Sequence, residues 1–178
     1  MAFSLSKLLR RFEPDYLREF DCSRGQIISS WAGIESSVDQ ANWYAWVYTR
    51  KRISRSVPVS LTRKLELFKD VNRDLLPFEP LRATASDLLS RIKALMDDRH
   101  WMAHGYLQPS ECTDAVWVLH KHEFPKETGG LAIKKRTFTR AEVIELRWTL
   151  ISLVNDMADY VNALAIQVTK QDFYDQRS

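Results

Sequence analysis

The chain has 178 residues, of which 45% are hydrophobic and 28% charged, and its formal net charge is +3. These values fit one globular domain, residues 1–178, that buries its core without disulfides or a structural metal. The two cysteines, Cys22 and Cys112, lie far apart in the sequence, which favours reduced thiols over a disulfide framework or a metal cluster. No apolar run approaches the ~20 residues that cross a bilayer, and charges interrupt the apolar runs near the N-terminus. We therefore expect a cytoplasmic protein that makes no membrane contact.

The residues before Gly105 predict helices. Apolar side chains that recur at alternating intervals of four and three positions mark one face of a helix. This rhythm predicts a long helix from Ile27 to Tyr48 and another helix over about residues 81–104. The other helices expected here are a short amphipathic one over residues 3–20, which breaks near Pro14 and is followed by a turn at residues 21–23, and one from Ser60 to about Leu76.

The residues after Gly105 predict a β-hairpin and one more long helix. Two runs of alternating β-formers, separated by turn residues, indicate a hairpin inserted at about residues 113–138. Thr139 and Glu142 have the spacing of a capping box and open the last helix. Residues 170–178 form a polar tail that is expected to fray. The predicted fold class is therefore mainly α, most simply an up-down four-helix bundle with a β-hairpin inserted before the last helix.

The helix over residues 81–104 ends in a concentration of ionisable side chains. Arg99 and Met102 occupy the next two positions on its apolar stripe. A permanent cation at a core-facing position needs a partner or a wet cleft. Gly105 is expected to end the helix in a left-handed turn, so that His104 lies at the helix C-terminus, where the helix dipole favours a cation.

Arg99, His104 and Tyr106 stand in an arrangement that resembles a known family motif. Arg-x4–6-His is the motif of the HEPN superfamily, small helical bundles of which many are metal-independent ribonucleases that act as toxins or antiphage effectors. The form Arg-x4-His-x-Tyr is that of HEPN toxins paired with a nucleotidyltransferase antitoxin. The resemblance implies that His104 is the catalytic base or acid, that Arg99 binds the scissile phosphate and that His100 assists. It also implies that Tyr106 contacts substrate or is modified by an antitoxin, and that two motif helices meet in a homodimer.

Two features outside the motif relate to the same chemistry. Glu35 lies beside the apolar stripe of the long helix. In several HEPN-like families an acidic residue there faces the motif arginine, so Glu35 is a candidate partner of Arg99; a solvated carboxylate is the alternative. A basic run that follows interleaved aromatic residues suits the phosphates and bases of RNA, although such a run also stabilises a helix C-terminus. The run consists of Arg50, Lys51, Arg52 and Arg55.

These patterns lead to one main functional hypothesis and one alternative. RNA cleavage without a metal needs a group that titrates near neutrality and a fixed cation for the developing phosphorane charge. We therefore expect a HEPN-type endoribonuclease without cofactor or metal. In the alternative, a catalytically silent HEPN-like bundle binds a protein or nucleotide partner, Arg99 makes a buried salt bridge and His104 only caps the helix. His100 and His104 are spaced so that both could face one metal, but the acidic residue of the zincin pattern is absent. His120 and His122 share a strand face, for which simple exposure is the alternative to metal binding.

Overall fold

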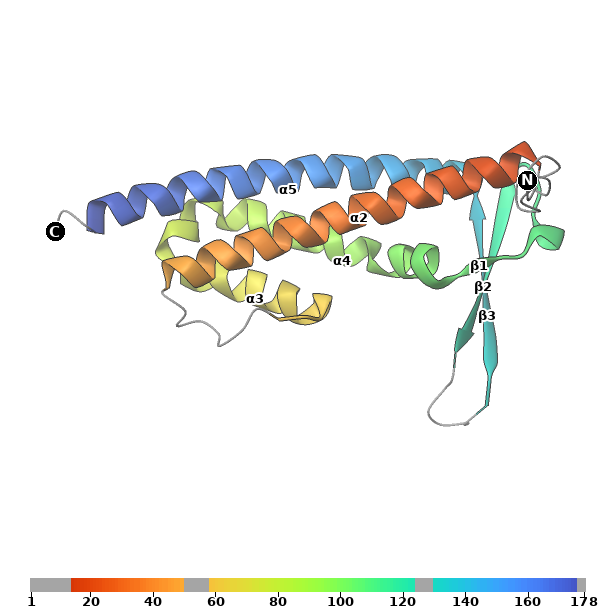
Figure 1. Ribbon diagram of the computed structural model, residues 1–178, viewed down its shortest axis with the longest axis horizontal. Coiled ribbons are helices and arrows are strands. Elements are labelled where there is room, and N and C mark those ends of the chain that lie inside the picture. Colours follow the sequence, from red (N-terminus) through yellow and green to blue (C-terminus); the bar gives the residue numbers. More distant parts are fainter. Residues whose placement is uncertain (1–13, 50–57, 124–129, 176–178) are drawn as a thin grey trace, which may run out of the picture. The chain divides into compact units, whose positions relative to one another are not determined.

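The computed structural model describes residues 14–49, 58–123 and 130–175 (Figure 1). This part of the chain is mainly helical, with four α-helices and a small three-stranded antiparallel sheet, so the expected fold class is confirmed to that extent. The chain divides into two compact units. The sheet unit takes the described residues of 1–29 and 97–148, and the helical unit takes those of 30–96 and 149–178. The expected single domain stays a prediction.

The helical unit contains stretches of all four helices. They belong to α2 (Asp15–Tyr48), α3 (Leu61–Asp74), α4 (Arg82–His104) and α5 (Arg140–Asp175), and the 3-10 helix η1 (Leu76–Leu81) joins α3 to α4. Buried polar contacts link these stretches. Asn42 of α2 donates to the Lys64 carbonyl of α3 over 3.0 Å, and the Tyr160 hydroxyl of α5 donates to Asn72 of α3. The largest fully buried side chains of this unit are Trp31, Phe68, Phe78, Ile34, Leu65, Leu88 and Ile92.

The sheet unit packs strands against helix ends. Its sheet has the order β1 (Tyr106–Leu107), β2 (Val116–Glu123), β3 (Ala132–Thr139), and a short 3-10 helix η2 (Pro109–Glu111) follows β1. Trp117 of β2 lies 5.2 Å from Phe20 of α2 between ring centroids, and its indole N–H donates to the Tyr16 carbonyl over 3.1 Å. Arg24 of α2 donates from Nε to the Met102 carbonyl at the end of α4 over 2.6 Å. These contacts fix the positions of β2 and the α4 terminus within the unit.

Most of the predicted elements are present. The apolar stripe of α2 is buried from Ile27 to Ala45, and the helices predicted to begin near residues 60 and 81 begin at Leu61 and Arg82. The hairpin is confirmed as β2 and β3, with Trp117 opposite Phe138. The capping box is also confirmed, because the Thr139 hydroxyl accepts from the Glu142 N–H over 3.2 Å and the Glu142 carboxylate accepts from the Thr139 N–H over 2.6 Å.

Three expectations, on the turn at residues 21–23, the helix before Pro14 and the C-terminal tail, need correction or restriction. The turn at residues 21–23 is wrong, because α2 runs without a break from Asp15 to Tyr48. Ser23 is buried on the same face as Leu17 and Phe20, so a small polar residue occupies a core position of a continuous helix. Relative to alanine, Asp21 and Ser23 each lower the stability of a helix by only about 0.5 kcal/mol. The burial of the flanking apolar residues contributes more than this cost. The helix expected before Pro14 lies outside the described residues, and α5 continues through the polar tail to Asp175.

None of the helices in the described ranges is both long enough and apolar enough to span a membrane.

Candidate functional site

A pocket of about 410 Å³ lies in the sheet unit where α4 ends. Its walls come from the last turn of α4, from β1 and from the outer end of β2. Every residue that lines it carries a side chain able to donate or accept a proton or a hydrogen bond. The lining residues are His100, His104, Tyr106, Lys121, His122 and Glu123.

The pocket exists because β1 is much shorter than β2. β1 pairs with β2 only at Tyr106 opposite His120 and Leu107 opposite Leu119. The next residues of β2, from Lys121 onward, pair with β3 on one side, and β1 does not extend to their other side. The edge of β2 that β1 leaves uncovered faces the end of α4, so side chains from a helix terminus and from a strand edge surround one space.

Gly105 sets the approach of α4 to the sheet. Its N–H donates to the Trp101 carbonyl over 2.8 Å and closes the last helical turn. A Cβ at this position would lie 2.7 Å from the same carbonyl oxygen and 3.1 Å from Leu119 Cβ, closer than side chains pack. The predicted helix end at His104 is therefore confirmed, but the predicted left-handed turn is wrong, since the Gly105 backbone does not adopt a positive φ. Glycine is required here for lack of space.

His100 and His104 lie one helical turn apart and both side chains are exposed, with their ring centroids 4.8 Å from each other. Partial burial lowers the pKa of His100, the positive charges of Lys121 and His104 lower it further, and Asp97 opposes the shift. An imidazole whose pKa lies below its ordinary 6.5 is mostly unprotonated at pH 7, so its free ring nitrogen is available to accept a proton. His100 is therefore suited to act as a base.

Lys121 supplies a fixed positive charge in the pocket. Its ammonium lies 2.7 Å from one carboxylate oxygen of Glu123 and 4.8 Å from the centroid of the Trp101 ring, and only 11% of the side chain is exposed. The other Glu123 oxygen lies 2.7 Å from the ammonium of Lys134. Hydrogen bonds from Lys121 and Lys134 lower the pKa of Glu123 to about 2, so the carboxylate is ionised at neutral pH. The ion pair and the aromatic ring hold the Lys121 ammonium in one place.

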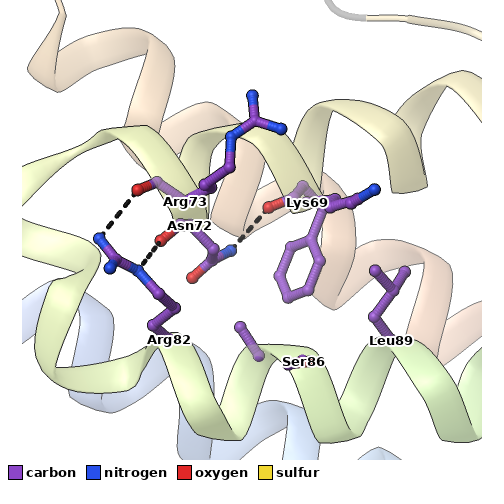
Figure 2. Close-up of a pocket in the computed structure, with 8 residues that line it drawn as sticks. Lys69, Asn72, Arg73, Arg82, Ser86 and Leu89 are labelled. Carbon is purple, nitrogen blue, oxygen red and sulfur yellow. Dashed lines mark hydrogen bonds between the residues drawn. The ribbon is translucent and has the colours of Figure 1, made fainter.

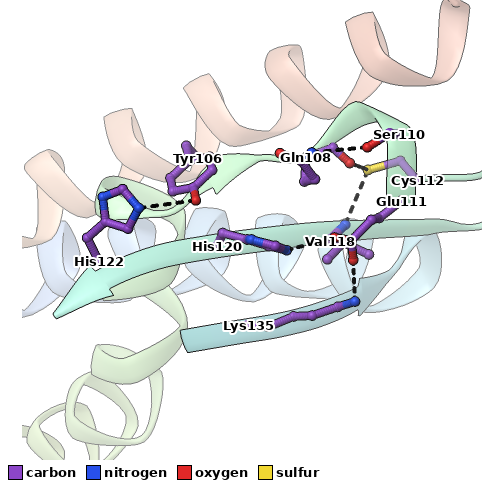
Figure 3. A network of polar contacts seen from close by, with 9 residues as sticks. All are labelled: Tyr106, Gln108, Ser110, Glu111, Cys112, Val118, His120, His122 and Lys135. Carbon is purple, nitrogen blue, oxygen red and sulfur yellow. Dashed lines mark hydrogen bonds and ion pairs between the residues drawn. The ribbon is translucent and has the colours of Figure 1, made fainter. Parts of the chain in front are cut away.

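Tyr106 lies on the opposite wall, against two histidines of β2. Its hydroxyl oxygen is 3.3 Å from His122 Nε2, within hydrogen-bonding distance, and its ring packs edge to face with the His122 ring at 5.3 Å between centroids (Figure 3). The His120 ring lies 5.6 Å from the Tyr106 ring between centroids, and its Nε2 is 3.2 Å from Glu111, whose carboxylate also pairs with Lys135. His122 therefore belongs to the pocket, and His120 belongs to a separate ion network.

The structure brings together some of the predicted site residues and leaves others apart. His100, His104 and Tyr106 line one pocket. Arg99 is half-buried on the same helix and is not one of the lining residues. Glu35 belongs to the helical unit, where it accepts a hydrogen bond from Trp31 Nε1 over 2.7 Å, so its pairing with Arg99 stays a prediction. The predicted RNA-binding run of Arg50, Lys51, Arg52 and Arg55 lies outside the described residues.

Three residues of the pocket were not predicted from the sequence as parts of a site, namely Lys121, His122 and Glu123. The alternation of residues 115–124 identified a strand, and His120 and His122 were expected on one face of it. Which end of the strand meets the motif helix depends on the register against β1, and two residues are too few to show a strand pattern. In the described part of the chain, no group of three or more His, Cys, Asp or Glu side chains is placed to hold a metal ion.

The comparisons with known proteins add no family assignment. Neither the protein-family models nor the curated proteins nor the solved structures contain a match to this chain. The resemblance to the HEPN motif therefore stays a prediction from the sequence, based on Arg99, His104 and Tyr106 and on the helix that ends at His104.

Proposed function

We propose that this protein is a metal-independent endoribonuclease and that the pocket at the end of α4 is its active site. The observation that carries the proposal is the pair of exposed imidazoles, His100 and His104, 4.8 Å apart between ring centroids in a pocket that also contains the fixed cation Lys121. Two imidazoles allow one to accept a proton while the other donates one. A cation between them and the substrate stabilises charge that develops on a phosphate.

The proposed reaction is an internal transfer of the phosphate. Neutral His100 takes the proton of a ribose 2′-hydroxyl, and the oxygen attacks the adjacent phosphorus. The bond from phosphorus to the 5′-oxygen breaks, and the leaving oxygen takes a proton from protonated His104, which lies at the negative end of the α4 dipole. The products are a 2′,3′-cyclic phosphate and a 5′-hydroxyl. Lys121 stabilises the phosphorane, and Arg99 binds a phosphate group of the substrate RNA.

The remaining parts of the proposal extend the resemblance to the whole molecule. In this proposal the four helices form the up-down bundle of HEPN proteins, Glu35 pairs with Arg99, and two copies of the chain join their motif helices in a cytoplasmic homodimer. The protein acts as a toxin or antiphage effector on RNA, and a nucleotidyltransferase-type antitoxin restrains it by modifying Tyr106. The exposure of Tyr106, 39% of the residue, supports this last role because another protein can reach part of this residue.

RNA cleavage in EDTA tests the catalytic proposal. The purified protein is incubated with a single-stranded RNA beside His100→Ala and His104→Ala, each expected to lose roughly 10²- to 10⁴-fold in rate. Arg99→Ala is tested beside them and is expected to lose cleavage chiefly through weaker binding of the RNA. His120→Ala is the matched control, because this histidine lies on the same strand as His122 but outside the pocket. Equal cleavage by all proteins would show contamination, and no cleavage by the wild type on any RNA would leave the binding module as the better hypothesis.

The pH dependence of the rate tests the role of Lys121. Replacing Lys121 with Met removes the charge that lowers the pKa of His100, so the acid limb of the rate profile should move to higher pH. Lys134→Met is the control, since it removes the other lysine on Glu123 but does not itself line the pocket and is not among the charges that lower the pKa of His100. An unshifted acid limb in Lys121→Met would exclude His100 as the base.

A sedimentation measurement that finds only monomers at micromolar concentration would exclude the dimer.

A further inference from the structure

A second pocket, of about 210 Å³, lies in the helical unit between α3 and the first turns of α4 (Figure 2). We propose that it binds a small organic acid, a compact apolar body that carries one carboxylate or phosphate group. The pocket is independent of the RNA-cleaving site, since all its lining residues belong to the helical unit. They are Phe68, Lys69, Asn72, Arg73, Arg82, Ala85, Ser86 and Leu89.

The inner part of the pocket is apolar and already formed. Phe68, Ala85 and Leu89 are buried and present carbon to the cavity. The one polar side chain at this depth, Asn72, uses its amide within the protein, donating to the Phe68 carbonyl over 2.8 Å and accepting from the Tyr160 hydroxyl. An apolar cavity of about 150 Å³ in another protein admits benzene. A cavity of about 210 Å³ therefore suits one or two fused rings or an equally compact alkyl group.

The rim of the pocket carries positive charge. Lys69, Arg73 and Arg82 line it, and no carboxylate is among the lining residues. Arg82 donates from Nε to the Asn72 carbonyl over 3.2 Å and from Nη2 to the Arg73 carbonyl over 2.8 Å, which holds its guanidinium at the end of α3 (Figure 2). Asp74 and Asp70 occupy the Arg73 guanidinium.

Lys69 and Arg82 are the cations best placed for an anion. The Lys69 side chain is exposed, and Arg82 keeps N–H groups beyond the two that its backbone bonds use. Ser86, exposed on α4, adds a hydroxyl at the pocket mouth. An apolar floor below a cationic rim is complementary to a ligand that has an apolar body and an anionic group at one end.

Calorimetric titration with matched probes tests the proposal. The probes are 2-naphthoate, its neutral analogue 2-naphthamide and 2-naphthyl phosphate, each added to the full chain. The naphthoate is expected to bind more tightly than the amide. Lys69→Ala should weaken naphthoate roughly three- to fivefold and leave the amide unchanged, as for an exposed ion pair. Ser86→Phe should abolish binding of both by filling the mouth, and Lys93→Ala, an exposed lysine of α4 outside the pocket, should change nothing.

The outcomes separate the parts of the proposal. Tighter binding of the phosphate than of the naphthoate would assign a phosphate head, and the reverse order would assign a carboxylate. Equal affinity for naphthoate and amide would overturn recognition of the anion. Absence of heat at millimolar naphthoate, or binding that survives Ser86→Phe, would overturn the site itself. Lys69→Glu provides a second variant on an exposed residue, where reversed charge should weaken the naphthoate further than Lys69→Ala does.

Discussion

Replacing Gly105 with alanine tests the packing that forms the candidate active site. The new Cβ would lie 2.7 Å from the Trp101 carbonyl oxygen, 3.1 Å from Leu119 Cβ and 3.3 Å from Leu119 Cδ1. The first contact is with backbone, so a side-chain rotation cannot relieve it. Leu119 is fully buried in β2 and has no space into which to retreat. The last turn of α4 must therefore open at the Trp101 carbonyl, and Gly105 must move away from Leu119 of the strand.

The magnitude follows from two opposed effects. Overpacking of this kind costs about 1–3 kcal/mol, and the lower chain entropy of unfolded alanine returns about 0.4–1 kcal/mol. We expect Gly105→Ala to lower the free energy of unfolding by about 1–2 kcal/mol, which is roughly 2–8 °C in Tm for a chain of this size. Because Gly105 stands between His104 and Tyr106, the rate of RNA cleavage should fall even under conditions where the variant is still folded.

Two other glycines supply matched controls in the same assay. A Cβ at Gly25, within α2, would have no atom within 4 Å, and a Cβ at Gly33 would meet Val154 at an ordinary 3.5 Å. Alanine at either position should stabilise the helix by about 0.5–1 kcal/mol. Urea unfolding followed by far-UV circular dichroism measures all three variants. If Gly105→Ala proves as stable as Gly25→Ala, the close approach of α4 to β2 is refuted.

Four further changes have expected results that follow from single contacts. Thr139→Ala removes the hydroxyl that caps α5 and should cost about 1 kcal/mol in urea unfolding. Hydrogen bonds from Thr139 lower the pKa of Glu142, so this carboxylate stabilises the protein above its ordinary value of 4.5 and loses that effect as the pH falls; Glu142→Gln should lack this acid-side decline. Tyr160→Phe leaves the buried Asn72 oxygen without its donor and should cost about 1–3 kcal/mol, and since burial raises the pKa of Tyr160, ultraviolet titration of the native protein should show one phenol that ionises late. The pKa of His100 is lowered, so below its ordinary value of 6.5 the unfolded chain binds the proton first and stability declines; His100→Gln should flatten that slope, and an unchanged slope would contradict the lowered pKa.

The helices could be predicted from the sequence because burial repeats along them. In α5, apolar residues recur at intervals of three and four, and all residues of this series are buried, as the rhythm leads one to expect in a packed helix. They are Val143, Leu146, Leu150, Leu153, Met157, Tyr160 and Leu164. The prediction of a turn at residues 21–23 was wrong because it also relied on the repeat of apolar residues. Ser23 interrupts the apolar rhythm, yet it occupies a core position, so the pattern broke where the helix did not.

Only part of the candidate site could be predicted from the sequence. His100, His104 and Tyr106 stand close together in the chain, and a motif that short can be recognised by resemblance. Lys121 and Glu123 reach the same pocket through strand pairing, and their position follows from the two residue pairs that join β1 to β2. Pairing register over two residues leaves no periodic trace, so no reading of the chain alone connects these side chains to the motif.

The site forms where two regular elements stop. Helix α4 ends at His104, so no further helical turn follows the side chains of its last turn. Beyond His120, the strand β2 extends past the short β1. Side chains at such boundaries are held by their neighbours and can line a pocket, as the exposed His104 does at the helix terminus and as Lys121 does beside Glu123. The Lys or Arg side chain that lines the pocket is therefore Lys121 of the strand, and Arg99 is not among the lining residues. If the chain cleaves RNA, loss of Lys121 should affect the rate of the chemical step, and loss of Arg99 should affect chiefly the affinity for the RNA.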